Sequence, residues 1–243
     1  MSIGNILVTG VSQGLGLQIA RVLLSRGATV YGISRNRTPE WIELEQAYPG
    51  RTEHRAVDLA RTETLKQAVF KDFIPNSVRL DGLVNNAAMA YDDLITNLDE
   101  AQLRRMYDVN VFAPMLLTKY AIRNMLFHRV AGSIVHVSSI SVHTGYKGLA
   151  MYASSKGALE AFSKNTAREW GERGIRSNCL VAGFMETNMS ASLSAEQKAR
   201  IYQRTALKTA TTVQSVAETV CFLLDKGAAS VTGQNIFVDS GTI

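Results

Sequence analysis

The pair Tyr152 and Lys156 lies four residues apart and combines a phenol with an ammonium group. On a helix, this spacing places both side chains on one face. A free phenol has a pKa of about 10, so it works as an acid-base group near neutral pH only when positive charge favours the phenolate. Lys156 supplies such a charge, and the pair therefore predicts a proton-transfer site. A solvated or snorkelling pair on a helix surface is the alternative.

Two further polar residues fit reduction of a carbonyl group. Ser138 and Ser139 end the strand predicted at 133–137. The Ser139 hydroxyl can hold the carbonyl oxygen while Tyr152 donates a proton to it and hydride reaches the carbon. Asn110 lies within a long stretch of helical period, where asparagine is a mediocre helix former. We interpret its side chain as holding a water that feeds protons toward Lys156. An asparagine on a polar helix face is the alternative.

A glycine-rich turn, Thr9-Gly10-Val11-Ser12-Gln13-Gly14-Leu15-Gly16, follows the first apolar run. Glycines there let the backbone turn tightly and let a pyrophosphate approach, while the unpaired amides of a helix N-terminus face the anion. Because a buried strand precedes the turn and an amphipathic helix follows it, the pattern predicts a dinucleotide site. A purely structural turn is the alternative. The predicted cofactor contacts here are Gly10, Ser12, Gln13, Gly14, Leu15 and Gly16.

The residues after the second predicted strand indicate which cofactor binds. A site for NAD usually has an acid there for the ribose 2′-hydroxyl, whereas a 2′-phosphate needs a cation. This chain has Ser34 and Arg35, and a guanidinium can contact phosphate in a bidentate way. We therefore predict NADP(H), with Arg37 as a second contact and solvated loop arginines as the alternative. Further predicted contacts are Asp58 and Leu59 near the adenine, and Asn86, Ala87 and Ala88 near the ribose.

Short apolar runs alternate with stretches of helical period, and these elements must position the polar residues. Strands are predicted at 5–9, 28–33, 55–59, 80–84, 133–137, 175–180 and 235–238. Helices are predicted around 15–23, 65–73, 99–125, 152–170, 194–204 and 213–224. Parallel strands need long crossovers, so the alternation predicts a doubly wound α/β fold with helices on both sheet faces. Ligands of such sheets bind at the carboxyl ends of the strands.

Composition and charge exclude several classes of protein. With 243 residues, 46% hydrophobic and 19% charged, the chain is predicted to form one domain over 1–243 and not a disordered protein. The net charge of +5 is too small and dispersed to indicate nucleic-acid binding. No apolar run reaches about 18 residues, so we expect a cytoplasmic protein without a signal peptide or membrane span. Cys179 and Cys221 are predicted to be buried free thiols, and no metal site is predicted.

Local turn signals are concentrated in one segment. The stretch 190–195 is the most loop-like part of the chain, and Ser194 with Gln197 predicts a capping box that starts a short helix.

These motifs resemble the short-chain dehydrogenase/reductase family along essentially the whole chain. The matching residues are Thr9, Gly10, Gly14, Gly16, Asp58, the segment 85–88, Asn110, Ser139, Tyr152, Lys156, Gly183 and Thr187. The resemblance implies a catalytic tetrad of Asn110, Ser139, Tyr152 and Lys156. It also implies that Lys156 holds the nicotinamide ribose, that Thr187 holds the carboxamide, and that the chain forms dimers or tetramers built on its two long helices.

Within this family, the chain is most similar to bacterial 3-oxoacyl-[acyl-carrier-protein] reductases, on the segments 91–94, 183–189 and 193–198. Gln13, Ala88 and Ala182 depart from the residues usual in those enzymes and are typical of a specialised relative. The resemblance implies NADPH-dependent reduction of a 3-oxoacyl thioester in fatty-acid or polyketide-like biosynthesis. A dehydrogenase of free alcohols or steroids is a second hypothesis, and a cofactor-sensing scaffold without turnover is a third.

The same resemblance implies a protein partner. An acidic acyl carrier protein would deliver the substrate and dock on Arg129 and Arg173 near the mouth of the active site. Two ordinary solvated arginines are the alternative.

Overall fold

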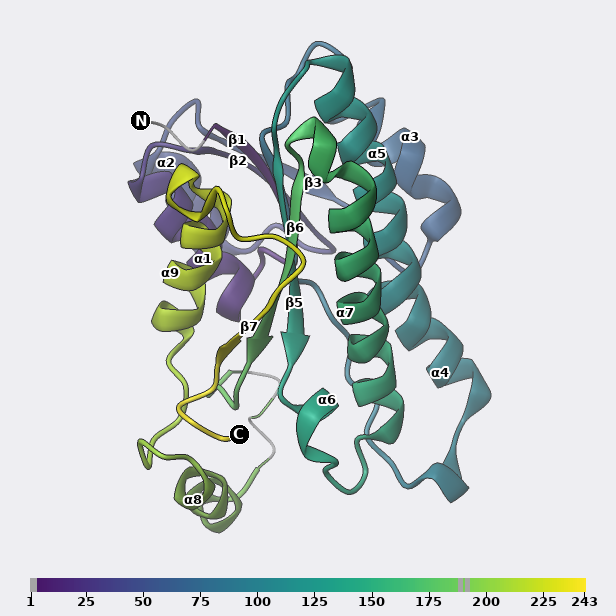
Figure 1. The fold of residues 1–243 in the computed structure, drawn as a ribbon, viewed down its shortest axis with the longest axis vertical. Helices are drawn as coiled ribbons and strands as arrows, with labels where there is room; N and C mark the ends of the chain where they lie inside the picture. The colour runs from purple at the N-terminus through teal and green to yellow at the C-terminus, as the bar shows by residue number, and fades with distance from the viewer. Residues whose placement is uncertain (1–3, 188–189, 191–192) are drawn as a thin grey trace.

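The computed structural model describes residues 4–187, 190 and 193–243. Asn188, Met189, Ala191 and Ser192, which belong to the reductase-like run and to the predicted loop, lie outside the described residues. In the described part, one parallel sheet has the strand order β3-β2-β1-β4-β5-β6-β7 (Figure 1). The predicted doubly wound α/β fold is confirmed.

The strands agree with six of the seven predicted positions to within two residues at either end. They run over Asn5–Thr9 (β1), Thr29–Ser34 (β2), Thr52–Ala56 (β3), Gly82–Asn85 (β4), Ser133–Ser139 (β5), Arg176–Ala182 (β6) and Asn235–Val238 (β7). The prediction for β3 is wrong by three residues. β3 lies at the edge of the sheet and has a largely polar sequence, whereas the apolar Val57 and Leu59 that suggested a strand follow it and are buried in a core cluster.

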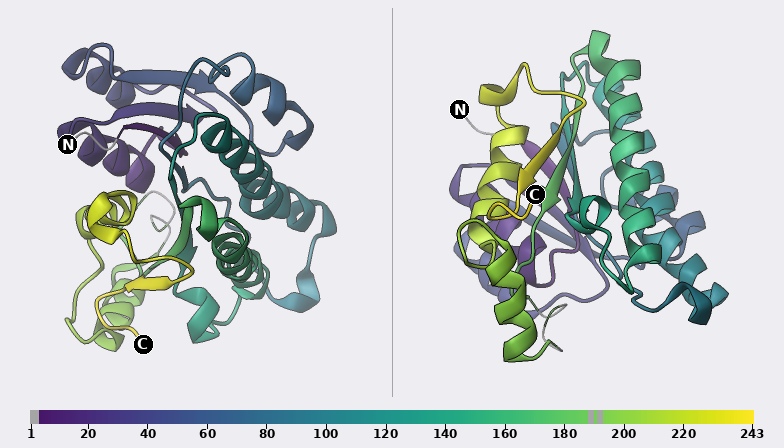
Figure 2. Two further views of the ribbon diagram at one scale, coloured as in Figure 1. Left: turned by 45° about the horizontal axis from the view of Figure 1, so that its top comes forward. Right: turned by 60° about the horizontal axis from the view of Figure 1, so that its bottom comes forward.

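Helices cover both faces of the sheet. They run over Gly14–Ser25 (α1), Pro39–Ala47 (α2), Leu65–Phe70 (α3), Glu100–Tyr107 (α4), Ala113–Phe127 (α5), Ser141–Thr144 (α6), Ala150–Trp170 (α7), Ala195–Arg204 (α8) and Val213–Leu224 (α9). Helices α1 and α9 pack on one face, and α3, α5 and α7 on the other (Figure 2). The predicted capping box of Ser194 and Gln197 is confirmed at the start of α8, whereas α2 and α6 were not predicted.

The long predicted helix at 99–125 is interrupted. Helices α4 and α5 flank a π-helical turn over Asp108–Phe112, with Asn110 at its centre. Pro114 follows in the first turn of α5. A proline in a helix lacks the N–H that would bond the carbonyl four residues earlier, and its ring clashes with that carbonyl. Here that carbonyl belongs to Asn110. The wider π-helical turn accommodates Pro114 and places Asn110 at the break between α4 and α5.

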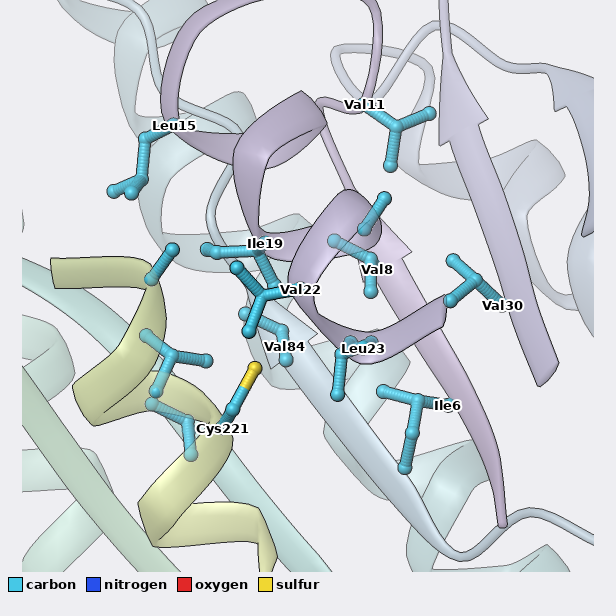
Figure 3. Close-up of a cluster of buried hydrophobic side chains, with 14 of the residues drawn as sticks. Ile6, Val8, Val11, Leu15, Ile19, Val22, Leu23, Val30, Val84 and Cys221 are labelled. Carbon is cyan, nitrogen blue, oxygen red and sulfur yellow. The ribbon is translucent and has the colours of Figure 1, made fainter. Parts of the chain in front are cut away.

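One of the two large cores holds α1 against β1 and α9. Ile19, Val22 and Leu23 of α1 meet Val8 of β1 and Cys221 of α9 (Figure 3). Burying each large aliphatic side chain contributes about 1.5–3 kcal/mol. This packing fixes the N-terminus of α1 at the carboxyl end of β1.

Two other predictions concern single features. Cys179 and Cys221 are free and buried, as predicted. None of the helices in the described ranges is long and apolar enough to cross a membrane.

Candidate active site

The turn between β1 and α1 leaves no room for side chains. Gly10 and Gly14 have φ values of +76° and +57°, in the left-handed region that favours glycine. A Cβ at Gly16 would overlap the carbonyl oxygen of Gly10 and the side-chain amide of Asn86. The first turn of α1 contains no acidic residue. This bare backbone cradle at a helix N-terminus fits the pyrophosphate of a dinucleotide.

Asn86 supports this turn from the end of β4. Its side-chain amide donates to the carbonyl of Thr9 at 2.9 Å, while the Thr9 hydroxyl accepts from the backbone N–H groups of Asn86 at 3.0 Å and Ala87 at 2.9 Å. The Asn86 side-chain donor is thus engaged by the turn, and the predicted ribose contact at 86–88 stays a prediction. Ala87 lies against Gly10, and Ala88 continues the chain along the same edge.

Two predicted cofactor residues point into the cores. The side chains of Leu15 and Leu59 are each only 7% exposed, and they belong to different core clusters. A ligand can meet only their backbone groups. Gln13 occupies the N-cap position of α1 with extended backbone, and the Ser12 carbonyl accepts from the Thr38 hydroxyl at 2.9 Å.

The end of β2 carries the two arginines predicted to contact phosphate. The buried Ser34 hydroxyl donates to the Asn36 carbonyl at 2.8 Å. Arg35 is exposed and has no carboxylate partner within the described residues, whereas Arg37 pairs with Glu45 of α2. The expectation that Arg37 assists with phosphate stays a prediction, and such a contact would compete with this exposed ion pair. Arg35 therefore remains the principal predicted contact for a 2′-phosphate.

Two other predicted contacts lie around the same sheet edge. One carboxylate oxygen of Asp58 accepts from Ala60 N at 3.1 Å, and the other lies 3.9 Å from the guanidinium of Arg105. Thr187, after β6, places its methyl group 3.9 Å from where a Cβ of Gly14 would be. The loops after β3 and β6 thus converge with the glycine turn on the carboxyl ends of the strands.

Tyr152 and Lys156 occupy the first two turns of α7, as the sequence predicts. The Lys156 ammonium is buried, lies 5.8 Å from the centre of the Tyr152 ring, and donates to the carbonyl of Val137 at 2.8 Å. Burial lowers the pKa of Lys156 to about 8, so most of its charge remains at neutral pH. Burial also lowers the pKa of the neighbouring His136 to about 3, helped by the charge of Lys156, and the imidazole is therefore neutral.

The phenol of Tyr152 is protonated in this protein at neutral pH. Its pKa is raised to about 12, chiefly by burial and also by the charge of Asp92, while a hydrogen bond with Ser139 acts in the opposite direction. The prediction that nearby positive charge, such as that of Lys156, favours the phenolate stays a prediction. A protonated phenol that contacts Ser139 is suited to donate a proton to a carbonyl oxygen.

Asn110 connects the loop after β4 to the catalytic helix. Its side-chain oxygen accepts from Met89 N at 2.8 Å, and its amide donates to Met89 O at 2.8 Å and to the Ser155 hydroxyl at 3.0 Å. Ser155 in turn donates to the carbonyl of Tyr152 at 2.7 Å. Asn110 therefore braces α7 beside Tyr152, and its predicted role in proton supply remains a prediction.

Asp92 is a site residue that sequence reasoning did not assign to the chemistry. Nothing in its local pattern relates it to Tyr152, which lies 60 residues later. Asp92→Asn should lower the pKa of the phenol, because it removes a negative charge that raises it. The decline of the reduction rate at high pH should therefore move to lower pH. At neutral pH, kcat should stay within about threefold, since the phenol remains protonated.

The matched control for that measurement is Asp93→Asn, at the adjacent position that does not act on the phenol. Rates measured from neutral to alkaline pH should separate the two variants. A profile that moves to higher pH in Asp92→Asn, or moves equally in both, would contradict the electrostatic assignment.

Arg129 and Arg173 do not lie at this site. They precede β5 and β6 at the amino ends of these strands, and Gly174 lies against Ala131 there. A strand of seven residues separates its two ends by about 20 Å. The prediction that both arginines flank the mouth of their own active site is therefore wrong, because every helix-to-strand loop of a parallel sheet lies at the edge opposite to the ligand.

Comparisons with known proteins place this geometry in a family. A family model described as enoyl-(acyl carrier protein) reductase matches residues 10–242. The chain is 33% identical over 238 residues to 3-oxoacyl-[acyl-carrier-protein] reductase FabG of Chlamydia pneumoniae, which covers 97% of this chain and 95% of that protein. The chain belongs to the short-chain dehydrogenase/reductase family. It is also 32% identical over 237 residues to carbonyl reductase [NADPH] 2 of Sus scrofa, with 97% and 94% covered.

Solved structures that resemble this chain share its fold. A short chain dehydrogenase from Burkholderia cenocepacia J2315 in complex with NADP has 27% identity and a TM-score of 0.89, with 99% of this chain and 98% of that chain covered. A 4-hydroxyisoleucine dehydrogenase complexed with NADH has 22% identity and a TM-score of 0.92, with 98% of both chains covered, and shows the fold alone. The protein is therefore an oxidoreductase that uses a nicotinamide cofactor.

The described residues contain no group of three His, Cys, Asp or Glu side chains arranged to hold a metal ion.

Proposed function

We propose that this protein reduces a 3-oxoacyl thioester, carried by acyl carrier protein, to the 3-hydroxyacyl thioester with NADPH. The observation that carries the proposal is the protonated phenol of Tyr152 in contact with Ser139 and close to the charge of Lys156. The 3-oxoacyl substrate class is supported by the FabG relatives. We place the reaction in fatty-acid or polyketide-like biosynthesis.

The chain's own residues supply proton transfer and stabilise charge. Tyr152 gives its phenolic proton to the ketone oxygen, and Ser139 donates a hydrogen bond to the same oxygen as negative charge develops there. Lys156 stabilises the phenolate that remains after transfer, because an opposite charge nearby favours the ionised form. The bound nicotinamide cofactor supplies the hydride that the carbonyl carbon accepts.

The preference for NADPH rests on the end of β2. Ser34 stands where an acid would bind the ribose 2′-hydroxyl, and the adjacent Arg35 is exposed without a carboxylate partner within the described residues. Gly10, Gly14 and Gly16 provide the cradle for the pyrophosphate. The NADP complex of the Burkholderia relative supports the same choice.

Assembly and carrier docking are part of the proposal. We propose a dimer or tetramer built on α5 and α7, which is supported by exposed aromatic rings next to and on α5, Phe112 at 50% and Phe127 at 68% exposed. Arg129 and Arg173 lie at the edge of the sheet opposite to Tyr152. Docking of an acidic carrier on these arginines therefore requires that the carrier serve the active site of another copy of the chain.

The substrate class can be tested by steady-state kinetics on three substrates with the same reacting ketone. A carrier-bound 3-oxoacyl thioester should give the highest kcat/KM. The kcat/KM of a short thioester mimic should be lower by about tenfold or more, and that of a free ketone should be the lowest. The advantage of the carrier should shrink as salt screens the charged contacts. If the free ketone were the best substrate, the second hypothesis would replace the first.

That second hypothesis is a dehydrogenase of free small-molecule alcohols or ketones. It is favoured by the relative named carbonyl reductase [NADPH] 2. A cofactor-sensing scaffold is less well supported, because a sensor has no need of the proton donor that Tyr152 and Lys156 form.

A further inference from the structure

Glu160 lies on α7 one turn after Lys156, outside the predicted tetrad, and its carboxylate is nearly buried, with 8% of the residue exposed. Three side chains from three other elements direct donors at it. The Ser138 hydroxyl donates to Oε1 at 2.5 Å, the Asn235 amide donates to Oε2 at 2.6 Å, and Nε2 of His143 lies 3.0 Å from Oε2. A buried carboxylate needs such partners, because an unpaired buried charge is strongly unfavourable.

The partners of Glu160 lie on both sides of Ser139 in the sequence. Ser138 precedes Ser139 at the end of β5, and His143 belongs to α6, which begins two residues after Ser139. Successive side chains of a strand point to opposite faces of the sheet. Anchoring one side chain at the end of a strand therefore also sets the direction of the next side chain. Anchoring Ser138 to α7 therefore fixes the direction in which Ser139 leaves the sheet.

The segment after Ser139 is fixed by the same carboxylate. The Ser139 hydroxyl accepts from the backbone N–H of Ser141 at 3.2 Å and from its hydroxyl at 3.0 Å, so Ser139 is bonded to the start of α6. The far end of α6 is held by His143, whose ring contacts Glu160 and packs on the ring of Phe237 at 4.9 Å. In Figure 1, α6 is the short helix below β5 and beside the first turn of α7.

We propose that Glu160 is a positioning residue for carbonyl reduction, which holds Ser138 and His143 and thereby keeps Ser139, between them in sequence, in contact with Tyr152. Glu160 acts through Ser139 and does not touch the reacting atoms. The inference rests on the roles proposed above for Ser139 and Tyr152. It extends the active site to a carboxylate that ties β5, α6, α7 and β7 together.

The first test is Glu160→Ala, compared with Glu169→Ala, which removes an exposed carboxylate from the same helix. With a short 3-oxoacyl thioester, kcat of Glu160→Ala should fall about tenfold to hundredfold, because small misplacements of reacting groups have effects of this size. KM and the dissociation constant for NADPH should each change less than about threefold. Glu169→Ala should match the wild type.

A pH profile distinguishes positioning from a general loss of stability. Tyr152 faces Ser139, whose hydrogen bond lowers its pKa, Asp92, which raises it, and the ammonium of Lys156. Loss of the Ser139 contact should therefore move the alkaline decline of the reduction rate to higher pH. Destabilisation alone would lower the amount of active enzyme and leave the profile in place, and that result would overturn the proposal.

A second measurement does not depend on turnover. Amide hydrogen exchange of peptides covering 139–146 should be about tenfold or more faster in Glu160→Ala, while peptides from α1 exchange as in the wild type. If the wild type does not reduce the thioester, the proposed function fails, and this measurement still decides whether Glu160 holds the segment. Unchanged exchange in 139–146 would overturn the inference.

Milder variants cover the case in which Glu160→Ala does not fold. Ser138→Ala and His143→Ala each remove one of the contacts that flank Ser139, and each should lower kcat with NADPH binding retained. Asn235→Ala removes the contact from β7 only and should change kcat by less than about threefold. If Asn235→Ala were as damaging as Ser138→Ala and His143→Ala, the carboxylate would serve overall packing and the proposal would be wrong.

Discussion

Replacing Tyr152 with phenylalanine is expected to lower turnover by about 10²- to 10⁴-fold, the range that general acid catalysis contributes. The phenyl ring keeps its place beside Lys156 in α7 and loses only the hydroxyl that carries the proton. The dissociation constant for NADPH should stay within about threefold, because the glycine cradle and Arg35 are untouched. Steady-state kinetics with a 3-oxoacyl thioester and fluorescence titration with NADPH measure the two quantities separately.

Tyr107→Phe is the matched control, since the Tyr107 hydroxyl contacts Ser154, next to the catalytic pair, at 2.9 Å. It should leave turnover close to the wild-type value. A Tyr152→Phe enzyme that keeps full turnover would remove the phenol from the mechanism. Equal losses in the two variants would point to packing of α7 as the cause.

Replacing Arg35 with alanine is expected to weaken NADPH binding about tenfold to a hundredfold and to leave NADH binding nearly unchanged. Loss of a charge-assisted bidentate contact has effects of this size. NADH has no 2′-phosphate, so it makes no such contact with Arg35 and loses none. The kcat/KM ratio of NADPH to NADH, measured for wild type and variant, reports the difference directly.

The control for that variant is Arg37→Ala, because Arg37 is a nearby exposed arginine that pairs with Glu45. Its effect on the cofactor preference should be small. A wild-type enzyme that uses the two cofactors with equal efficiency would contradict the assignment to NADPH, as would an Arg35→Ala enzyme with an unchanged ratio.

Much of the fold follows from periodicity. The buried strands β1 and β5 contain short apolar stretches, 6–8 in β1 and 134–137 around His136 in β5, and the amphipathic stripe of α1 follows its glycine turn at the predicted place. The errors have physical causes. The edge strand β3 has only one strand neighbour and a polar sequence, and the break before α5 depends on the clash of a proline with a carbonyl one turn earlier.

Some residues of the candidate site could likewise be predicted from the sequence, and others could not. Residue type and spacing predict Ser139, Tyr152 and Lys156, because the chemistry demands a phenol, a cation and a hydroxyl near a strand end. The roles of Asp92 and Glu160 depend on contacts between segments far apart in the sequence, which no local pattern encodes. The placement of Arg129 and Arg173 was wrong because a resemblance in sequence does not state which end of the sheet a loop occupies.

The most direct test of the central claim is to follow the hydride. The purified protein is incubated with a 3-oxoacyl thioester and NADPH that carries deuterium at the transferring position, and the product is analysed by mass spectrometry. We predict a 3-hydroxyacyl thioester with one deuterium on C3 for each NADPH oxidised, and no oxidation of NADPH with the corresponding 2-enoyl thioester. Two results would contradict the account. One is enzyme that binds NADPH but leaves the 3-oxoacyl thioester unreduced and unlabelled, and the other is enzyme that reduces the 2-enoyl thioester and not the 3-oxoacyl thioester.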